Sequence, residues 1–184
     1  MMINKIKTKV RNLFPFAVVA VVAAVGSGCS EKTEPEASET TVDVSQSIRI
    51  LDTNPADTIS VGEARQTLQP GASVSLAGQI GGVEAPFFEG YAGFVLGDPE
   101  ILFCDEMDEE HCPMPWDACC EDPDKLKSLR ASVQFVDAQG LPVAKSLKGF
   151  AGLKELDHVV VTGTVAATST PENLIIEADG LYVK

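Results

Sequence analysis

The chain has 184 residues, enough for one domain of ordinary size with terminal extensions, and its apolar content of 45% is normal for a globular protein. The net charge of −13 is unevenly spread: residues 1–28 carry four basic side chains and no acidic one, so the remainder holds 10 basic against 27 acidic side chains. A surface this acidic repels the phosphates of nucleic acids and of anionic membranes, and it favours cations or basic partners.

The N-terminus has the pattern of an export signal. Basic residues in 1–11 precede an apolar run over 13–25, whose 13 residues are too few to span a bilayer comfortably. The run ends in the sequence V-G-S-G-C, which closes with Cys29 and resembles the lipobox of bacterial lipoproteins, although leucine is usual where Gly26 stands. A plain signal peptide with an incidental cysteine, or an uncleaved anchor, is the alternative.

The lipobox resemblance implies a role for each N-terminal segment. Residues 1–28 would be removed as a lipoprotein signal peptide, and Cys29 would carry acyl chains that hold the protein to a membrane leaflet. We therefore expect a lipid-anchored protein of the bacterial cell envelope that faces the periplasm or the exterior. Because Val42 is the only large apolar residue in 31–43, we expect residues 29–46 to be a disordered tether.

Residues 47–184 have the pattern of a mainly β domain. A short strand is predicted over 47–51, and the capping-box spacing of Ser60 and Glu63 predicts a short helix that ends before Pro70. Phe150, Leu153 and Leu156 fall at helical spacing and predict a helix over 148–156. The other predicted strands cover residues 73–80, 91–96, 132–136 with a return at 141–143, 159–165, and 174–178 with a continuation at 181–183.

Two of the predicted strands share the pattern V-x-[LV]-x-G-x-[IV], with Gly78 in the first and Gly163 in the second. This repetition predicts one curved sheet that bends at each glycine. The order of three strands, a helix and two strands over residues 73–184 resembles the OB-fold, a five-stranded barrel with its helix between strands 3 and 4. An immunoglobulin-like or jelly-roll sandwich, which would lack the helix, is the alternative.

The OB-fold resemblance implies a ligand face across the second and third strands, between the loops that join strands 1–2 and 4–5. Aromatic residues stand at those places: Phe94 and Phe135 on the strands, although the core is the commoner place for them, and Phe87 and Phe88 in the first loop. No Lys or Arg occurs between Gln66 and Asp124, so phosphate neutralisation would be weak and nucleic-acid binding is not expected.

An unusual acidic loop, residues 98–124, lies between the second and third strands. It has eleven acidic residues, no Lys or Arg, and four of the five cysteines. Its segment C-P-M-P-W-D-A-C-C resembles one found in small bacterial envelope lipoproteins, and this resemblance implies no activity. We expect Trp116 in this segment to cap the loop, with an exposed partner anchor as the alternative.

Two hypotheses account for the loop cysteines, which are Cys104, Cys112, Cys119 and Cys120. Export to an oxidising compartment and the even count favour two disulfides, in which Cys104 and Cys112 each pair with one of the two adjacent cysteines. The alternative is a zinc or copper site made of the same thiolates, with His111 and Met114 as further ligands. Against that alternative, the spacing lacks the C-x2-C pairs of familiar zinc sites.

The sequence carries no recognisable catalytic motif. Its only histidines are His111 and His158, and it has no G-x-S-x-G, P-loop, G-x-G-x-x-G or H-E-x-x-H pattern. We therefore expect a non-catalytic, lipid-anchored envelope protein that needs no cofactor and binds an unknown partner or ligand through an OB-like domain with a disulfide-stapled loop. The alternatives are a metal-binding lipoprotein, and an OB module that binds oligosaccharide or nucleic acid.

Overall fold

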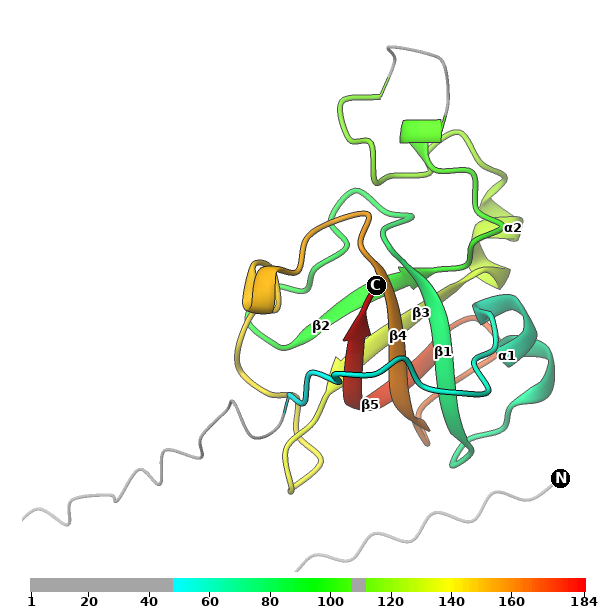
Figure 1. Cartoon of the computed structure of the whole chain (residues 1–184). Helices are drawn as coiled ribbons and strands as arrows, with labels where there is room; N and C mark the ends of the chain where they lie inside the picture. The colour runs from blue at the N-terminus through cyan, green and yellow to red at the C-terminus, as the bar shows by residue number, and fades with distance from the viewer. Residues whose placement is uncertain (1–47, 107–111) are drawn as a thin grey trace, which may run out of the picture. The chain divides into compact units, whose positions relative to one another are not determined.

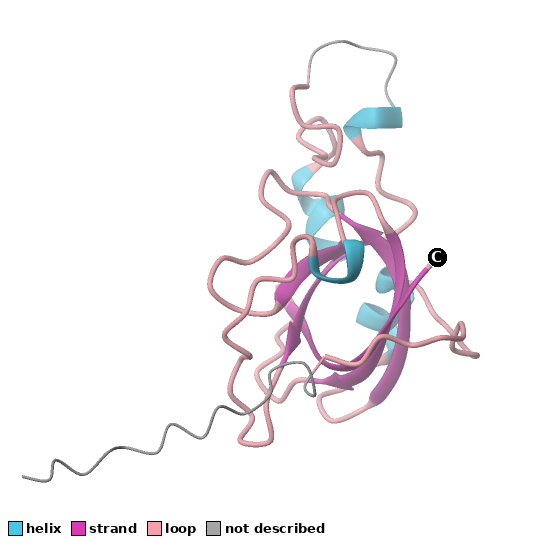
Figure 2. Ribbon diagram, turned by 60° about the vertical axis from the view of Figure 1, so that its left-hand side comes forward, coloured by secondary structure: helices cyan, strands magenta, loops and turns pink. Residues whose placement is uncertain are grey.

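Five β-strands form one mixed sheet that closes into a ring in the computed structural model (Figures 1 and 2). The structure describes residues 48–106 and 112–184, which belong to the compact unit Thr40–Lys184. The predicted signal peptide, the tether, Cys29 and His111 lie outside the described residues. Within the described part of the chain, no helix combines the length and the apolar character that crossing a membrane requires.

The order of the strands along the chain is close to the predicted one. In chain order, the elements are α1 (Val61–Thr67), β1 (Ser73–Ile80), β2 (Gly93–Gly97), the 3-10 turn η2 (Cys104–Glu106), α2 (Pro123–Ser128), β3 (Arg130–Phe135), the 3-10 turn η3 (Phe150–Gly152), β4 (His158–Val165) and β5 (Leu174–Val183). The prediction of a mainly β domain is thus confirmed.

The ring runs in the order β1-β2-β3-β5-β4, and β4 pairs back with β1. All neighbouring strands are antiparallel except β3 and β5, which are parallel. The pairing of β1 with β4 extends from Ser73 opposite Thr164 to Gln79 opposite His158. By contrast, the pairing of β1 with β2 is short and covers only Gln79 and Ile80 of β1.

The two strands that share a sequence pattern are direct partners. Gly78 of β1 lies opposite Val159, and Gly163 of β4 lies opposite Val74. A side chain on Gly78 would place its Cβ 2.5 Å from the carbonyl oxygen of Gly97, closer than real contacts allow, so only glycine permits this approach of β1 to β2. At Gly163 the register of β4 against β5 shifts, which marks a bulge.

Alternating apolar side chains fill the ring. On β3 the odd positions Ala131, Val133 and Phe135 are buried, as the two-residue period of a strand requires. Phe94 of β2 is fully buried beside them, and Leu76 of β1 is as well. This core accounts for why the five strands close around one interior.

The helix predicted over 148–156 is wrong. Only the three-residue turn η3 forms there, and Gly149, Ala151 and Gly152 have φ angles of 79°, 50° and 83°. Left-handed backbone at three of four successive positions cannot continue a right-handed helix. The apolar residues at helical spacing instead pack separately, with Leu153 in the ring core and Leu156 against a second cluster.

Other elements differ in extent from their predictions. Helix α1 is confirmed, with the Ser60 hydroxyl accepting a hydrogen bond of 3.3 Å from the Glu63 amide. Helix α2 was not predicted, although Asp122 caps it and Pro123 occupies its first turn. The strand predicted over 47–51 reduces, in its described residues, to one bridge between Ile50 and Leu181.

The acidic loop has a small core of its own. Ile101, Phe103 and Ala118 from the loop pack with Leu126 and Leu129 at helix α2, and all five are buried. This second cluster holds the described parts of the acidic loop against helix α2. Two of its members, Phe103 and Ala118, directly precede Cys104 and Cys119 in the chain.

Candidate functional site

Three cysteine sulfurs of the acidic loop converge at one point. The Sγ atoms of Cys104, Cys112 and Cys119 all lie within 4.8 Å of one another. Cys119 is the central member, because its Sγ is 3.1 Å from that of Cys112 and 3.8 Å from that of Cys104. Cys120 stands beside the group, with its Sγ 3.9 Å from Cys119 Sγ. We call these four residues the cysteine cluster.

Backbone hydrogen bonds fold the loop so that these cysteines meet. The amide of Cys104, at the start of η2, donates to the carbonyl of Asp117 over 2.9 Å, and the amide of Asp105 donates to Pro115 over 3.0 Å. The Asp117 amide donates in turn to the carbonyl of Met114, which reverses the chain direction. These contacts bring Cys104 within reach of a cysteine fifteen residues later.

Mutual hydrogen bonding makes the thiols unequal as acids. The pKa of the Cys119 thiol lies below its ordinary value, because Cys112 first, and then Cys104 and Cys120, can donate to its sulfur. The pKa values of Cys112 and Cys120 are raised, mainly because each of them donates to Cys119. The thiols around Cys119 would thus stabilise a thiolate there, which is the form that binds a metal ion.

Acidic side chains of the loop bond to the loop's own backbone. Glu106 accepts from the Phe103 amide over 3.2 Å, and Asp117 accepts from the Ala118 amide over 2.8 Å. Glu121 accepts from the Asp122 amide over 3.0 Å. These carboxylates shape the loop, and they also keep the potential around the sulfurs negative, which favours a cation.

The structure contains no bond between any two loop cysteines, and all four are free. The sulfurs of Cys104, Cys112 and Cys120 lie 3.1–3.9 Å from that of Cys119, well beyond the roughly 2.05 Å of a disulfide, so the disulfide pairing stays a prediction. Of the predicted metal ligands, the structure brings together Cys104, Cys112 and Cys119.

Trp116 fastens the loop to the ring. Its indole Nε1 donates to the carbonyl of Glu84 over 2.9 Å, and its carbonyl accepts from the Gly82 amide over 2.8 Å. The side chain is half-buried, in keeping with the capping role predicted for it, and it borders a hollow that also contacts Phe88. The base of the cysteine cluster is thereby tied to the segment that follows β1.

The aromatic ligand face predicted from the OB-fold resemblance needs correction. Phe94 and Phe135 are fully buried in the ring core, Phe87 is 8% exposed, and only Phe88 is half-buried. Phe87 packs edge-on against Phe94, with ring centroids 6.2 Å apart. Three of the four phenylalanines are therefore core residues, and for Phe94 and Phe135 the two-residue period of the strands accounts for their burial.

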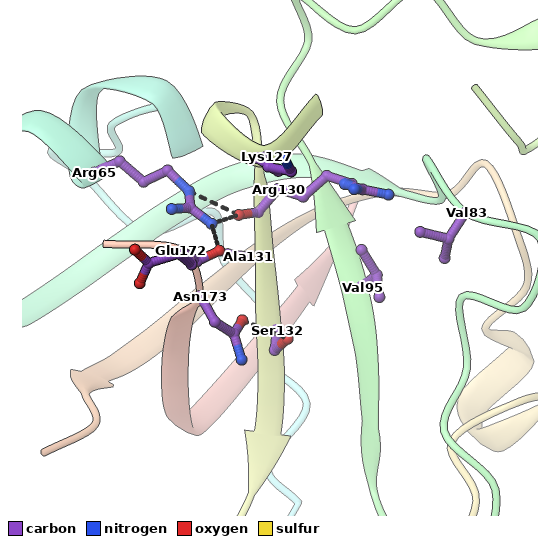
Figure 3. Close-up of a pocket in the computed structure, with 9 residues that line it drawn as sticks. All are labelled: Arg65, Val83, Val95, Lys127, Arg130, Ala131, Ser132, Glu172 and Asn173. Carbon is purple, nitrogen blue, oxygen red and sulfur yellow. Dashed lines mark hydrogen bonds between the residues drawn. The ribbon is translucent and has the colours of Figure 1, made fainter. Parts of the chain in front are cut away.

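A groove with basic side chains lies over the outer face of β2 and β3 (Figure 3). Its volume is about 230 Å³, and it is lined by Arg65, Val83, Val95, Lys127, Arg130, Ala131, Ser132, Glu172 and Asn173. The cations come from helix α1, from helix α2 and from the first residue of β3. We call it the basic groove.

These cations were not predicted, because the absence of Lys and Arg between Gln66 and Asp124 was the basis for expecting an uncharged ligand face. Three cations lie just outside that span, namely Arg65, Lys127 and Arg130. The folded chain brings them together over the outer face of β2 and β3. The unpredicted helix α2 positions one of them. The Asp-Pro start signal at 122–123 was the feature in the sequence that could have placed it.

Comparison with known proteins adds no assignment to this geometry. The chain matches no protein-family model, and neither curated proteins nor solved structures give a significant match.

Proposed function

We propose that the protein is a lipid-anchored protein of the bacterial cell envelope that binds one thiophilic metal ion, Zn²⁺ or Cu⁺, at the cysteine cluster. It acts by binding and not by turnover. The ligands are the thiolates of Cys104, Cys112 and Cys119, with Cys120 as the nearest candidate for a fourth position. The lipid anchor is Cys29.

One observation carries the metal proposal, namely the spacing of the sulfurs. Thiolates about 2.3 Å from a tetrahedral zinc ion lie about 3.8 Å from one another, because the edge of a tetrahedron is roughly 1.6 times its centre-to-corner distance. The spacings from Cys119 Sγ to Cys104 Sγ, 3.8 Å, and to Cys120 Sγ, 3.9 Å, match that edge, whereas the 3.1 Å to Cys112 Sγ is shorter than the edge. Soft thiolate ligands favour zinc or monovalent copper over harder cations.

The surroundings of the cluster support a resident ion. Cys104 is buried on the small core of the loop, whereas Cys119 is exposed, so the site has a fixed base and an open side for entry. The acidic loop raises the local concentration of cations before capture. We take the disulfide-stapled loop as the competing outcome.

We further infer that the ring is an OB-like barrel. The strand order β1-β2-β3-β5-β4 and the parallel pairing of β3 with β5 support this inference. The short turn η3 takes the place of the helix that the fold usually has between strands 3 and 4. The barrel would then serve as the scaffold that presents the metal-binding loop.

A competition titration tests the proposed function. The whole reduced chain in detergent is titrated with Zn²⁺, and separately with Cu⁺, in the presence of a chromophoric chelator. We expect the chain to withdraw one ion per molecule, and Cys29→Ser to do the same, because Cys29 belongs to the anchor. If the reduced wild-type chain withdraws neither ion, the proposal is wrong.

A further inference from the structure

We propose that the basic groove binds the oxyanion of a small ligand, a carboxylate or phosphate carried beside hydroxyl groups, as in an acidic sugar. The site is separate from the cysteine cluster and does not depend on the metal. It is carried by two half-buried guanidinium groups that have no carboxylate partner.

The guanidinium of Arg65 is held only by backbone carbonyls. Its Nε and Nη2 donate to the carbonyl of Arg130 over 2.9 Å and 2.8 Å, and its Nη1 donates to the carbonyl of Pro171 over 2.8 Å (Figure 3 shows the first two). These bonds fix the plane of the group without neutralising its charge. The pKa of Arg65 is lowered by burial and by the positive charge of Arg130.

The guanidinium of Arg130 likewise donates only to backbone carbonyls among the described residues. Its Nε donates to the Leu126 carbonyl over 3.1 Å and its Nη1 donates to Gly82 over 2.9 Å, while Nη2 has no hydrogen bond to any described residue. Neither arginine has a carboxylate oxygen within 4.0 Å among residues 48–106 and 112–184. Burial lowers the pKa of Arg130, and the carboxylate of Asp117 opposes that effect.

Two positive charges that are partly removed from water and left unpaired are electrostatically costly, and a bound oxyanion would offset that cost. Lys127 adds a third cation at the groove, and its Nζ also bonds to Asp124 over 2.9 Å. The one acidic side chain that lines the groove is Glu172. The groove is thus a local positive site on a strongly acidic protein, which suits one small anion better than a polyanionic chain.

Polar groups beside the cations indicate what the rest of the ligand carries. The Ser132 hydroxyl donates to Asn173 Oδ1 over 3.2 Å, and the side-chain nitrogen Nδ2 of Asn173 makes no hydrogen bond within the described residues. This pair can exchange hydrogen bonds with a hydroxyl group of a ligand. Val83 and Val95 line the same groove and can contact the carbon skeleton of a sugar.

Two matched lysine variants test the proposal by calorimetry on the whole chain in detergent. The probes are glucose 1-phosphate, glucuronate and neutral glucose, which separate a phosphate source from a carboxylate source. Lys127→Glu and Lys125→Glu change the net charge equally on the same helix, and each lysine forms an exposed ion pair, but only Lys127 lines the groove. We expect saturable binding of at least one anionic probe and not of glucose.

The variants then locate the site. Lys127→Glu should weaken binding of the anionic probe on the order of tenfold, whereas Lys125→Glu should change it by less than about twofold. Equal losses in both variants, or no saturable binding of either anionic probe at millimolar concentration, would overturn the proposal. Because all measurements use the same metal state of the chain, neither result bears on the cysteine cluster.

Discussion

Cys119 is the residue on which the proposed metal site depends most. Its sulfur is within 3.9 Å of three other cysteine sulfurs, and its pKa is lowered by the hydrogen bonds that they donate. A thiolate is the form that binds metal, so this central thiol, whose pKa is lowered, should contribute most to affinity.

Replacing Cys119 and Cys120 by serine separates a central ligand from a peripheral one. We expect Cys119→Ser to lower metal affinity by more than the roughly 10–100-fold that loss of an outer partner costs, and Cys120→Ser to lower it less. The same chelator competition measures both. An equal effect of the two changes, or none, would contradict the central position given to Cys119.

The residues of the site show where sequence reasoning succeeds and where it stops. The grouping of the four loop cysteines followed from their place in one acidic loop between two predicted strands. That three sulfurs meet, with Cys119 between the others, depends on the reversal of the chain at Met114–Asp117, which the sequence pattern does not reveal. The cations of the basic groove were missed because residues distant in sequence converge only on the closed sheet.

At the scale of elements, strands with a two-residue period were predicted well, whereas of the two described α-helices only α1, which has a capping box, was predicted. β1 forms over the predicted residues, because its buried positions alternate. The helix predicted over 148–156 fails, because Gly149 and Gly152 take left-handed backbone that helical spacing of apolar residues cannot detect. Helix α2 forms in only six residues, too few to show a period.

Asp98 couples helix α1 to the end of β2. Its side chain is 1% exposed, and its two carboxylate oxygens accept from the Gly62 amide over 2.8 Å and from the Glu100 amide over 2.9 Å. This residue, counted in the acidic loop by its sequence, is thus a buried structural acceptor. Its loss should loosen the helix that carries Arg65.

We expect Asp98→Asn to lower the free energy of unfolding by about 1–3 kcal/mol, because an amide nitrogen would face one of the two backbone donors in a buried place. Denaturant unfolding measures the change. The matched control is Asp52→Asn, whose side chain is exposed, and it should stay within about 0.5 kcal/mol of the wild type. A loss for Asp98→Asn no greater than that of the control would refute this role.

A chain of contacts links the two sites at the element scale. The carbonyl of Trp116 in the acidic loop accepts from the Gly82 amide, and the carbonyl of Gly82 accepts from Arg130 of the basic groove. Gly82 has a φ of 80°, a conformation that glycine adopts without strain. The segment after β1 is therefore the shared support of both sites.

At the scale of the whole molecule, charge and location are proposed to act together. An acidic domain repels anionic membrane surfaces, so a protein of this charge needs a covalent anchor if it is to stay at a membrane. The lipobox resemblance around Cys29 supplies that anchor in our proposal. The ring would then present the cysteine cluster in solution, close to the membrane.

The most direct test of the metal site is a paired count of metal and thiol on protein purified without reductant or chelator. Elemental analysis gives the zinc and copper content, and thiol titration after denaturation with chelator gives the free cysteines of the loop. The proposed site predicts about one ion per chain and four titratable loop thiols. No metal together with no free loop thiol would contradict it and would establish two disulfides in its place.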